Sequence, residues 1–404
     1  MKKDDLTKTN ILNSEMKKVE VMQKKEGMVD IMFVVDHSLD LVGGSVESLK
    51  VIMDYIKNKY VVALFSPGRY SDNDSKIKHF HHSKHKSMKA MIKHPIEFFR
   101  YYIRLVKTIN EISPKIIHTQ EQIGYFAVAF FKRMKWIRGD IILIHTERGL
   151  YEKYSNLIKK IFFFSLPYTN YVITTTNYNR DLWISAVKNK FGKYDDKYMV
   201  IENTAGKKFE IYDENESGRK VDELKLGFAG RYCSWKGWEL VENICYCLKD
   251  DDIFVEIVMG CDNQKEVNST NAMFARIYEK LGKRFSGHIN YNINEMNEFY
   301  YRIDVFGITS DPGTESFGRV LVEAMSRKVV VIGTNCGGAT EVIGNFEHIL
   351  NTAEEFADFA RKLKYDRKQL QKKAEDSLIR FREKYSLINN IEKHNILYQK
   401  VIGR

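Results

Sequence analysis

Short apolar runs alternate with helix-like segments along almost the whole chain, and they form two successive series. A short apolar run bounded by turn residues is typical of a buried strand, and the amphipathic segment between two such runs is typical of a crossover helix. The alternation predicts an α/β protein with parallel, doubly wound sheets. The first series is MVDIMFVVD, VVALFS, KIIHTQ, DIILIHT, YVITTT and YMVIEN, and the second is LKLGFAG, DIFVEIVMG, KRFSGHI, IDVFGIT and KVVVIGT.

The length of the chain favours two domains. At 404 residues it exceeds the size at which one hydrophobic core usually keeps growing. The highly charged stretch KKFEIYDENESGRKVDELK lacks a long apolar run and separates the two series. We therefore predict a charged leader at residues 1–27, a first Rossmann-like domain at 28–205 and a second at 206–375, facing each other across a cleft.

The most specific segment is TESFGRVLVEAMSRKVVVIGTNCGGATEVI, residues 314–343. Glu315 and Glu323 are eight residues apart, which is just over two helical turns, so a helix that begins near Ser316 would carry both on roughly the same side. The first backbone N–H groups of such a helix have no partner within it, and the helix dipole favours an anion there. We expect a bound diphosphate to meet the N–H groups of Ser316, Phe317 and Gly318.

ESFGRVLVEAM resembles the signature of retaining GT-B glycosyltransferases of the family 4 type, also called glycosyl transferases group 1, in which two glutamates are separated by seven residues. GTNCGGATEVI is similar to the glycine-rich turn and glutamate that follow in that family. The resemblance implies two tandem Rossmann-like domains, with a nucleotide-sugar donor held mainly by the second. It also implies that Glu315 contacts hydroxyl groups of the donor sugar and that Glu323 contacts the nucleotide ribose.

A second match is LGFAGRYCSWKGWELVENI, in which Arg231 and Lys236 follow a strand and Gly237 precedes a helix. The resemblance implies that these two cations clamp the donor diphosphate. Two cations beside a departing diphosphate would stabilise its developing charge in place of a metal ion. We therefore expect no metal and no other cofactor, and the nucleotide sugar is a substrate.

Weaker matches complete the frame. The resemblance places Gly287, His288 and Ile289 beside the nucleotide base, and His145 close to the transferred sugar. It also places the loop of Gly43 and Gly44 against the donor phosphates from across the cleft. EKYSLINNIEKHNILYQKVI is similar to the closing helix of the family, so residues 376–404 are expected to return to the first domain.

Ordinary structural roles remain open for the same residues. Glu315 and Glu323 could be a helix-capping acid and a surface glutamate, and Arg231 and Lys236 could be surface cations. A histidine after an apolar strand, such as His145, is often a hydrogen-bonded structural residue. The adjacent glycines could simply permit a tight strand-to-helix turn.

Positive charge is concentrated in the first half of the chain. The formal net charge is +11, and the stretch from Lys76 to Lys107 carries nine lysines and arginines against the single acid Glu97. This stretch is either a solvated loop followed by an amphipathic core helix, or a patch that lies on anionic lipid. The leader has no apolar core of signal-peptide length, and the five cysteines form no CxxC pair. We expect a cytoplasmic protein, peripheral on the inner face of the cell membrane if the patch binds lipid.

The expected reaction is sugar transfer from a nucleoside-diphosphate sugar, by family resemblance a UDP-sugar, to a hydroxyl of a glycan or lipid-linked acceptor of the cell envelope. The retaining mechanism is expected to be front-side attack rather than double displacement. A catalytically silent glycosyltransferase-like subunit that serves another enzyme remains the alternative. No nucleic-acid-binding motif is present, and the first strand is not followed by the GxGxxG pattern of a dinucleotide-binding dehydrogenase.

Overall fold

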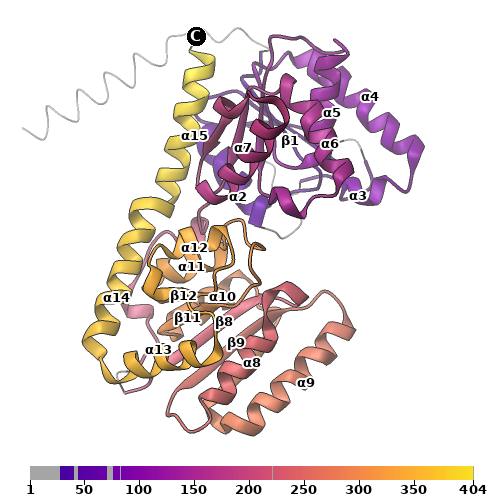
Figure 1. Ribbon diagram of the computed structural model, residues 1–404. Helices are drawn as coiled ribbons and strands as arrows, with labels where there is room; N and C mark the ends of the chain where they lie inside the picture. The colour runs from indigo at the N-terminus through magenta and orange to yellow at the C-terminus, as the bar shows by residue number, and fades with distance from the viewer. Residues whose placement is uncertain (1–27, 41–43, 71–75, 82, 221, 404) are drawn as a thin grey trace, which may run out of the picture.

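The computed structural model describes residues 28–403, except for 41–43, 71–75, 82 and 221. It contains a seven-stranded sheet in the order β3-β2-β1-β4-β5-β6-β7 and a five-stranded sheet in the order β10-β9-β8-β11-β12. Every neighbouring pair of strands in both sheets is parallel. The two sheets belong to separate α/β domains, which Figure 1 shows one above the other. The prediction of two tandem doubly wound domains is confirmed.

The N-terminal sheet has helices on both faces. Its strands are β1 (Ile31–Val34), β2 (Val62–Ser66), β3 (Ile77–His81), β4 (Ile116–Thr119), β5 (Ile142–Glu147), β6 (Tyr171–Thr174) and β7 (Tyr198–Val200). The helices of this domain are α2 (Gly44–Ile56), α3 (Met88–Met91), α4 (Pro95–Ile112), α5 (Gln122–Arg133), α6 (Asn156–Ser165) and α7 (Asn177–Phe191). The basic stretch from Lys76 to Lys107 does not begin with a loop, because its first residues form the edge strand β3.

The two-residue period of a strand divides the core of this domain into two layers. In β1, Met32 and Val34 pack in a cluster with residues of α4 to α7, whereas Ile31 and Phe33 pack in a second cluster with residues of α2 and α15. All four side chains are essentially inaccessible to solvent. Burial on both faces explains why the run is continuously apolar rather than alternating.

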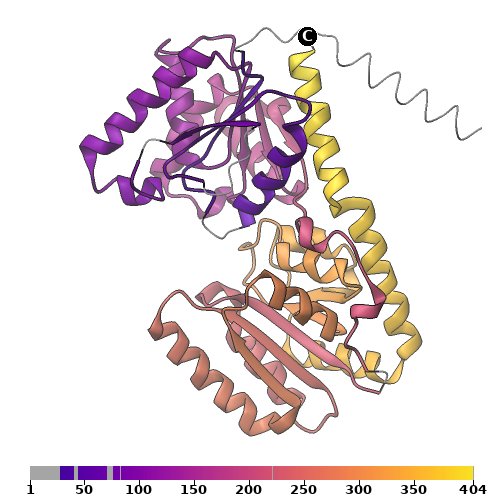
Figure 2. The same ribbon diagram turned by 180° about the vertical axis from the view of Figure 1, so that it is seen from behind.

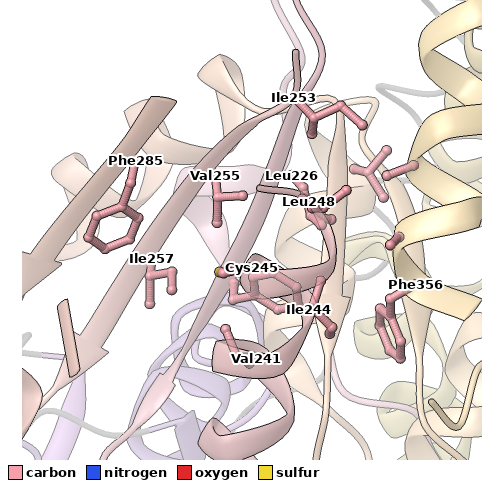
Figure 3. Packing of buried hydrophobic residues seen from close by; sticks show 14 of the residues in the cluster. Leu226, Val241, Ile244, Cys245, Leu248, Ile253, Val255, Ile257, Phe285 and Phe356 are labelled. Carbon is pink, nitrogen blue, oxygen red and sulfur yellow. The ribbon is translucent and has the colours of Figure 1, made fainter. Parts of the chain in front are cut away.

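The C-terminal sheet is smaller and is built in the same way. Its strands are β8 (Lys225–Arg231), β9 (Phe254–Gly260), β10 (Phe285–Ile289), β11 (Val305–Ile308) and β12 (Val330–Gly333). Its helices are α8 (Trp238–Cys247), α9 (Gln264–Leu281), α10 (Ile293–Arg302), α11 (Arg319–Ser326), α12 (Gly338–Ile343), α13 (Ala353–Tyr365) and α14 (Arg367–Arg380). Figure 3 shows one layer of its core, in which side chains of β8 and β9 meet Ile244 and Cys245 of α8 and Phe356 of α13.

The chain returns to the N-terminal domain at its end. A π-helical turn, Phe381–Tyr385, follows α14 and leads into α15 (Leu387–Ile402), which runs along the N-terminal domain in Figures 1 and 2. The Tyr398 hydroxyl of α15 is 2.7 Å from Nδ1 of His118 on β4, and the Tyr60 hydroxyl donates to Asn395 at 3.0 Å. These contacts hold α15 against the N-terminal domain, although α15 follows the C-terminal domain in sequence.

Among the described residues, no helix combines the length and the apolar character that crossing a bilayer requires.

Candidate functional site

The carboxyl ends of the strands in the two sheets face each other across the domain boundary. The Thr176 hydroxyl, just after β6, donates to the carbonyl of Ser316, which follows β11, at 2.9 Å. The Glu341 carboxylate of α12 accepts hydrogen bonds from the Asn177 side chain at 2.7 Å and from the Tyr178 N–H at 3.0 Å, at the start of α7. Ligands of open α/β sheets bind outside these strand ends, at the point where the strand order reverses. Here those points lie between β1 and β4 and between β8 and β11.

An ion pair crosses the switch point of the C-terminal sheet. Lys236, after β8, lies 2.6 Å from a carboxylate oxygen of Glu315, after β11, and the Ser310 hydroxyl donates to that oxygen at 2.8 Å. The two charged side chains keep 15% and 14% of their accessible surface, so the pair is neither deeply buried nor freely solvated. Sequence analysis predicted both residues for the donor site, and the fold brings them into contact over a separation of 79 residues.

The two loops that carry this pair are tied together by backbone contacts. Gly237 has φ +65°, and a Cβ at this position would lie 2.0 Å from the carbonyl oxygen of Thr309. The Thr309 hydroxyl in turn donates to the Lys236 carbonyl at 2.8 Å, and the Asp311 N–H donates to the Trp235 carbonyl at 2.8 Å. Only glycine permits this approach, so the glycine that was predicted to open the helix also holds Lys236 against the second loop.

Arg231 is the last residue of β8, and its side chain is exposed at the same edge of the sheet. The Trp238 indole donates to its carbonyl at 3.0 Å, which fixes the backbone. Within the described part of the chain, its guanidinium has no hydrogen-bond or ion-pair partner. An exposed arginine beside a lysine can bind a diphosphate without first breaking another contact.

The helix of the glutamate motif begins later than predicted. Gly318 caps α11 in the left-handed conformation with φ +82°, so the helix starts at Arg319 rather than near Ser316. The N–H groups of Ser316, Phe317 and Gly318 therefore belong to the connecting loop, and the Phe317 side chain is buried. A left-handed glycine ends the regular backbone on its N-terminal side, so Glu315 lies in the loop after β11 and not at the mouth of the helix.

Glu323 has a different environment from Glu315. It is buried on α11, accepts a hydrogen bond from the Tyr300 hydroxyl at 3.0 Å and pairs with Arg319 at 2.9 Å. Burial raises the pKa of this carboxyl, although the Arg319 charge and the Tyr300 hydroxyl act in the opposite direction. Both partners of the Glu323 carboxylate are protein groups. A contact between Glu323 and a ribose stays a prediction.

The predicted base-binding residues lie on the edge strand β10. A Cβ at Gly287 would lie 2.5 Å from the Phe274 ring, so packing alone accounts for this glycine. The His288 ring stacks on Tyr291 with 4.7 Å between the ring centres, and burial lowers its pKa. Ile289 packs against the core of the domain. Base recognition by these residues stays a prediction.

The structure gives His145 a structural environment. It is completely buried on β5, stacks on Tyr125 with 4.0 Å between the ring centres, and has both ring nitrogens hydrogen-bonded, to Thr119 at 3.0 Å and to Glu147 at 3.3 Å. Both ring nitrogens are thus engaged by protein groups, and a role of His145 beside the transferred sugar stays a prediction. Of the glycine pair, Gly43 lies outside the described residues, and Gly44 is the first residue of α2.

Sequence analysis missed a cluster of acids and histidine at the switch point of the N-terminal sheet. Asp36 and His37 follow β1, and Glu121 follows β4. The Asp36 carboxylate accepts hydrogen bonds from the Ile123 and Gly124 N–H groups at 2.8 and 2.7 Å, and His37 pairs with Glu121 at 3.3 Å. Charged residues directly after two buried strands were the signal that could have indicated this site.

Burial and mutual charge perturb these groups. Burial, with a smaller effect of the Glu121 charge, raises the pKa of Asp36 to about 7. The hydrogen bond with Glu121 raises the pKa of His37. For Glu121, burial acts to raise the pKa, but His37 and other donors outweigh burial and lower the pKa of this carboxyl. A carboxyl that titrates near neutral pH at a switch point is a candidate for binding or proton transfer.

Unpaired polar atoms gather at the same edge. Among the described residues, His37 Nδ1, Gln120 Nε2 and Arg148 Nε are buried without a hydrogen-bond partner. Arg148 and Gln120 are joined to each other at 2.9 Å. Buried donors without partners are rare in folded proteins, and a polar ligand at this edge would satisfy them.

Comparisons with known proteins agree with this geometry. Residues 211–377 match the family model described as glycosyl transferases group 1. They include Arg231, Glu323 and the Lys236–Glu315 pair that crosses the C-terminal switch point. This segment is similar to the glycosyl transferases group 1 family.

Solved structures support the GT-B fold of the whole chain. The chain is similar to a glycosyltransferase from Rickettsia africae, with a TM-score of 0.72 and 21% identity over 93% of this chain and 99% of that one. It is also similar to Anabaena Alr3699/HepE in complex with UDP and glucose, with a TM-score of 0.67 and 15% identity over 92% of this chain and 100% of that one. The predicted GT-B fold is therefore confirmed.

A curated relative of this chain is described as a probable sucrose-phosphate synthase from Thermosipho melanesiensis. The two are 36% identical over 259 residues, which span 59% of this chain and 59% of that protein. A second relative is an uncharacterized protein in the cps region of Klebsiella pneumoniae, 23% identical over 64% of this chain and 68% of its own length.

Proposed function

We propose that the protein is a retaining glycosyltransferase that transfers a sugar from a nucleoside-diphosphate sugar to a hydroxyl acceptor. The observation that carries this proposal is the Lys236–Glu315 pair across the C-terminal switch point, inside the segment that matches the glycosyltransferase family. A cation and a carboxylate in contact can separate to meet the two parts of one donor. Lys236 would bind the diphosphate, and Glu315 would accept hydrogen bonds from hydroxyls of the transferred sugar.

Arg231 would complete the diphosphate site. Its side chain is exposed at the end of the strand that precedes Lys236, so the two cations approach one ligand from the same loop. As the glycosidic bond breaks, negative charge builds on the leaving diphosphate, and two fixed cations stabilise it without a metal ion. A UDP-sugar is the proposed donor, since the similar Anabaena protein was solved with UDP and with UDP-glucose.

Front-side attack is the mechanism we propose for retention. The bond between C1 of the sugar and the diphosphate oxygen breaks, and the acceptor oxygen bonds to C1 from the same face. The acceptor proton passes to the departing phosphate oxygen, so the reaction needs no carboxylate nucleophile. Glu315 is suited to hold sugar hydroxyls rather than to attack C1, because Lys236 and Ser310 already share one of its oxygens.

Binding of the donor can be tested by a thermal-shift panel of UDP, GDP, ADP and their glucose conjugates, with EDTA and with magnesium. A ligand at a hundredfold excess over its Kd stabilises the folded state by about 2.7 kcal/mol. For a cooperative unit of this domain size, that corresponds to a rise in Tm of roughly 5–10 °C. The proposal expects one nucleotide to give this shift in EDTA.

The test variant is Arg231→Ala, because Arg231 has no partner among the described residues whose loss would itself destabilise the fold. The matched control is Lys249→Ala, which removes an exposed cation from the same domain, away from the strand ends. The shift should disappear in the first variant and persist in the second. If no nucleotide shifts the Tm of the wild-type protein, the donor site is absent, and the chain would be a catalytically silent subunit.

A further inference from the structure

A large groove opens beside α4 in the N-terminal domain. It has a volume of about 1240 Å³ and lies between α4 and α5, with side chains of α3 and α6 at its ends. In both ribbon views, α4 lies on the side of the domain away from α15 (Figures 1 and 2). The volume exceeds the roughly 300–1,000 Å³ of pockets that hold ordinary small ligands, and most of the lining residues are aromatic or aliphatic.

Helix α4 presents its residues to the groove in ordered rows. Tyr101, Leu105 and Ile109 pack into the core of the domain. The next row around the helix, Phe98, Tyr102 and Val106, lines the groove and is half-buried. Beyond it lies a third apolar row, Ile96, Phe99 and Ile103, whose side chains are 70%, 67% and 67% exposed. The spacing of three and four residues places each row on one face of the helix.

The opposite wall of the groove is apolar at its open edge as well. Phe130 of α5 and Trp136, which follows that helix, line the groove and are 39% and 52% exposed. Met134 and Leu157 add exposed apolar surface nearby, at 46% and 66%. Contiguous exposed apolar surface of this kind marks a binding site for a partner or a lipid rather than an ordinary solvated face.

Cations flank the apolar surface. Arg100, Arg104 and Lys107 form a row on α4 directly beside the exposed apolar row, and Lys89 lines the groove itself. Lys93 lies between α3 and α4. In the described residues, Lys89, Lys93 and Arg100 have no hydrogen-bond or ion-pair partner. An apolar groove bordered by these three cations is complementary to a molecule that joins a hydrocarbon chain to an anionic group.

The inner end of the groove is polar. Asp36, His37, Glu121 and Gln122 line it, together with Tyr154, which hydrogen-bonds to Glu147 at 2.7 Å. Asp36, His37 and Glu121 follow β1 and β4, so this end opens at the switch point on the edge of the sheet that faces the C-terminal domain. A ligand that fills the groove would therefore direct its polar end toward the proposed donor site.

We propose that this groove binds a lipid-linked acceptor, with its hydrocarbon chain against α4 and α5, its phosphate held by Lys89, Lys93 and Arg100, and its hydroxyl-bearing end at Asp36 and Glu121. This inference rests on the proposed function, because the acceptor is a substrate of that reaction. The raised pKa of Asp36 suits a group that exchanges hydrogen bonds with an acceptor hydroxyl near neutral pH.

The probe is dodecyl phosphate below its aggregation concentration, added to the full chain in EDTA. Its uncharged comparison is dodecyl maltoside, and its comparison without a chain is inorganic phosphate. Trp136 lines the groove and reports binding through its fluorescence, with Trp136→Phe to assign the signal. The test variant is Phe99→Gln with Ile103→Gln, which changes two exposed side chains and should fold. The control is Phe346→Gln, which changes a 91% exposed side chain elsewhere.

The proposal expects saturable binding of dodecyl phosphate, at least about tenfold tighter than either comparison compound, weakened at least about tenfold in the double variant and unchanged in the control. Lys93→Gln with Arg100→Gln should remove the preference over dodecyl maltoside. Each of three results would overturn it: no binding to wild type; a dimer that the double variant dissociates, which makes a second copy the occupant; or binding only after deletion of residues 1–27, which makes the leader the occupant.

UDP titrations on the same samples separate this inference from the proposed function. UDP binding without dodecyl phosphate binding rejects the groove as an acceptor site and leaves the transferase proposal standing. The absence of UDP binding rejects the transferase proposal itself, whatever the groove binds.

Discussion

Replacement of Glu315 by glutamine should separate the two halves of donor recognition. In the structure, Glu315 and Lys236 form a contact of 2.6 Å with about 15% of each side chain exposed. Exposed pairs contribute roughly 0–1 kcal/mol, whereas removal of one partner of a fully buried pair costs roughly 3–5 kcal/mol. For this intermediate burial we expect a coupling free energy of about 1–2 kcal/mol, which urea unfolding of Glu315→Gln, Lys236→Met and the double variant would measure.

The same pair sets the affinity for the donor. A nucleoside diphosphate must compete with Glu315 for Lys236, so Glu315→Gln should leave UDP affinity unchanged or raise it by up to about tenfold, which matches 1–2 kcal/mol. The preference for UDP-glucose over UDP should fall in that variant, because the sugar hydroxyls lose a charged acceptor. Lys236→Met should weaken both ligands. Titrations followed by tryptophan fluorescence would measure this, with Lys249→Met as the control. Equal losses of UDP affinity in Glu315→Gln and Lys236→Met would refute the reasoning.

Three further predictions concern the framework of the site. Gly237→Ala should destabilise the protein by clearly more than Gly192→Ala, because both have a left-handed backbone but only at Gly237 would the Cβ meet a carbonyl oxygen, and equal losses in urea unfolding would contradict this. Glu341→Ala should remove two hydrogen bonds at the start of α7 and increase the radius of gyration in small-angle scattering; an unchanged radius would show that these contacts do not hold the domains together. Asp36→Asn should change the pH dependence of stability. Because the pKa of Asp36 is raised, the folded wild-type protein retains a proton that the unfolded chain loses, and the stability of the wild type falls from about pH 4 to pH 7. The difference in stability between variant and wild type should therefore grow over that window. A constant difference would contradict the assigned pKa.

The sequence was sufficient to predict the two sheets, and its motifs singled out Lys236 and Glu315. Buried parallel strands are apolar on both faces, so their runs stand out against the charged segments between them. Lys236 and Glu315 were singled out separately, because each lies in a segment that resembles a motif of the family. Their contact could not be derived from the sequence alone, because it depends on the order of strands in the sheet, which places β8 beside β11.

The errors have a common cause in local geometry. The start of α11 was placed three residues too early because the motif alone does not show that Gly318 adopts a left-handed conformation. His145 was placed beside the sugar by resemblance, and the sequence did not indicate that its ring would stack on Tyr125 in a buried position. Asp36, His37 and Glu121 were passed over because they match no motif, and only the strand order brings them together.

The most direct test of the account is calorimetric titration of UDP-glucose in EDTA into the wild-type protein, Arg231→Ala and Lys249→Ala. We expect one site per chain without a metal ion, an affinity at least about tenfold weaker in Arg231→Ala, and no change in Lys249→Ala. Absence of binding to the wild-type protein under these conditions, or equal binding to all three proteins, would contradict a donor site at the switch point of the C-terminal sheet.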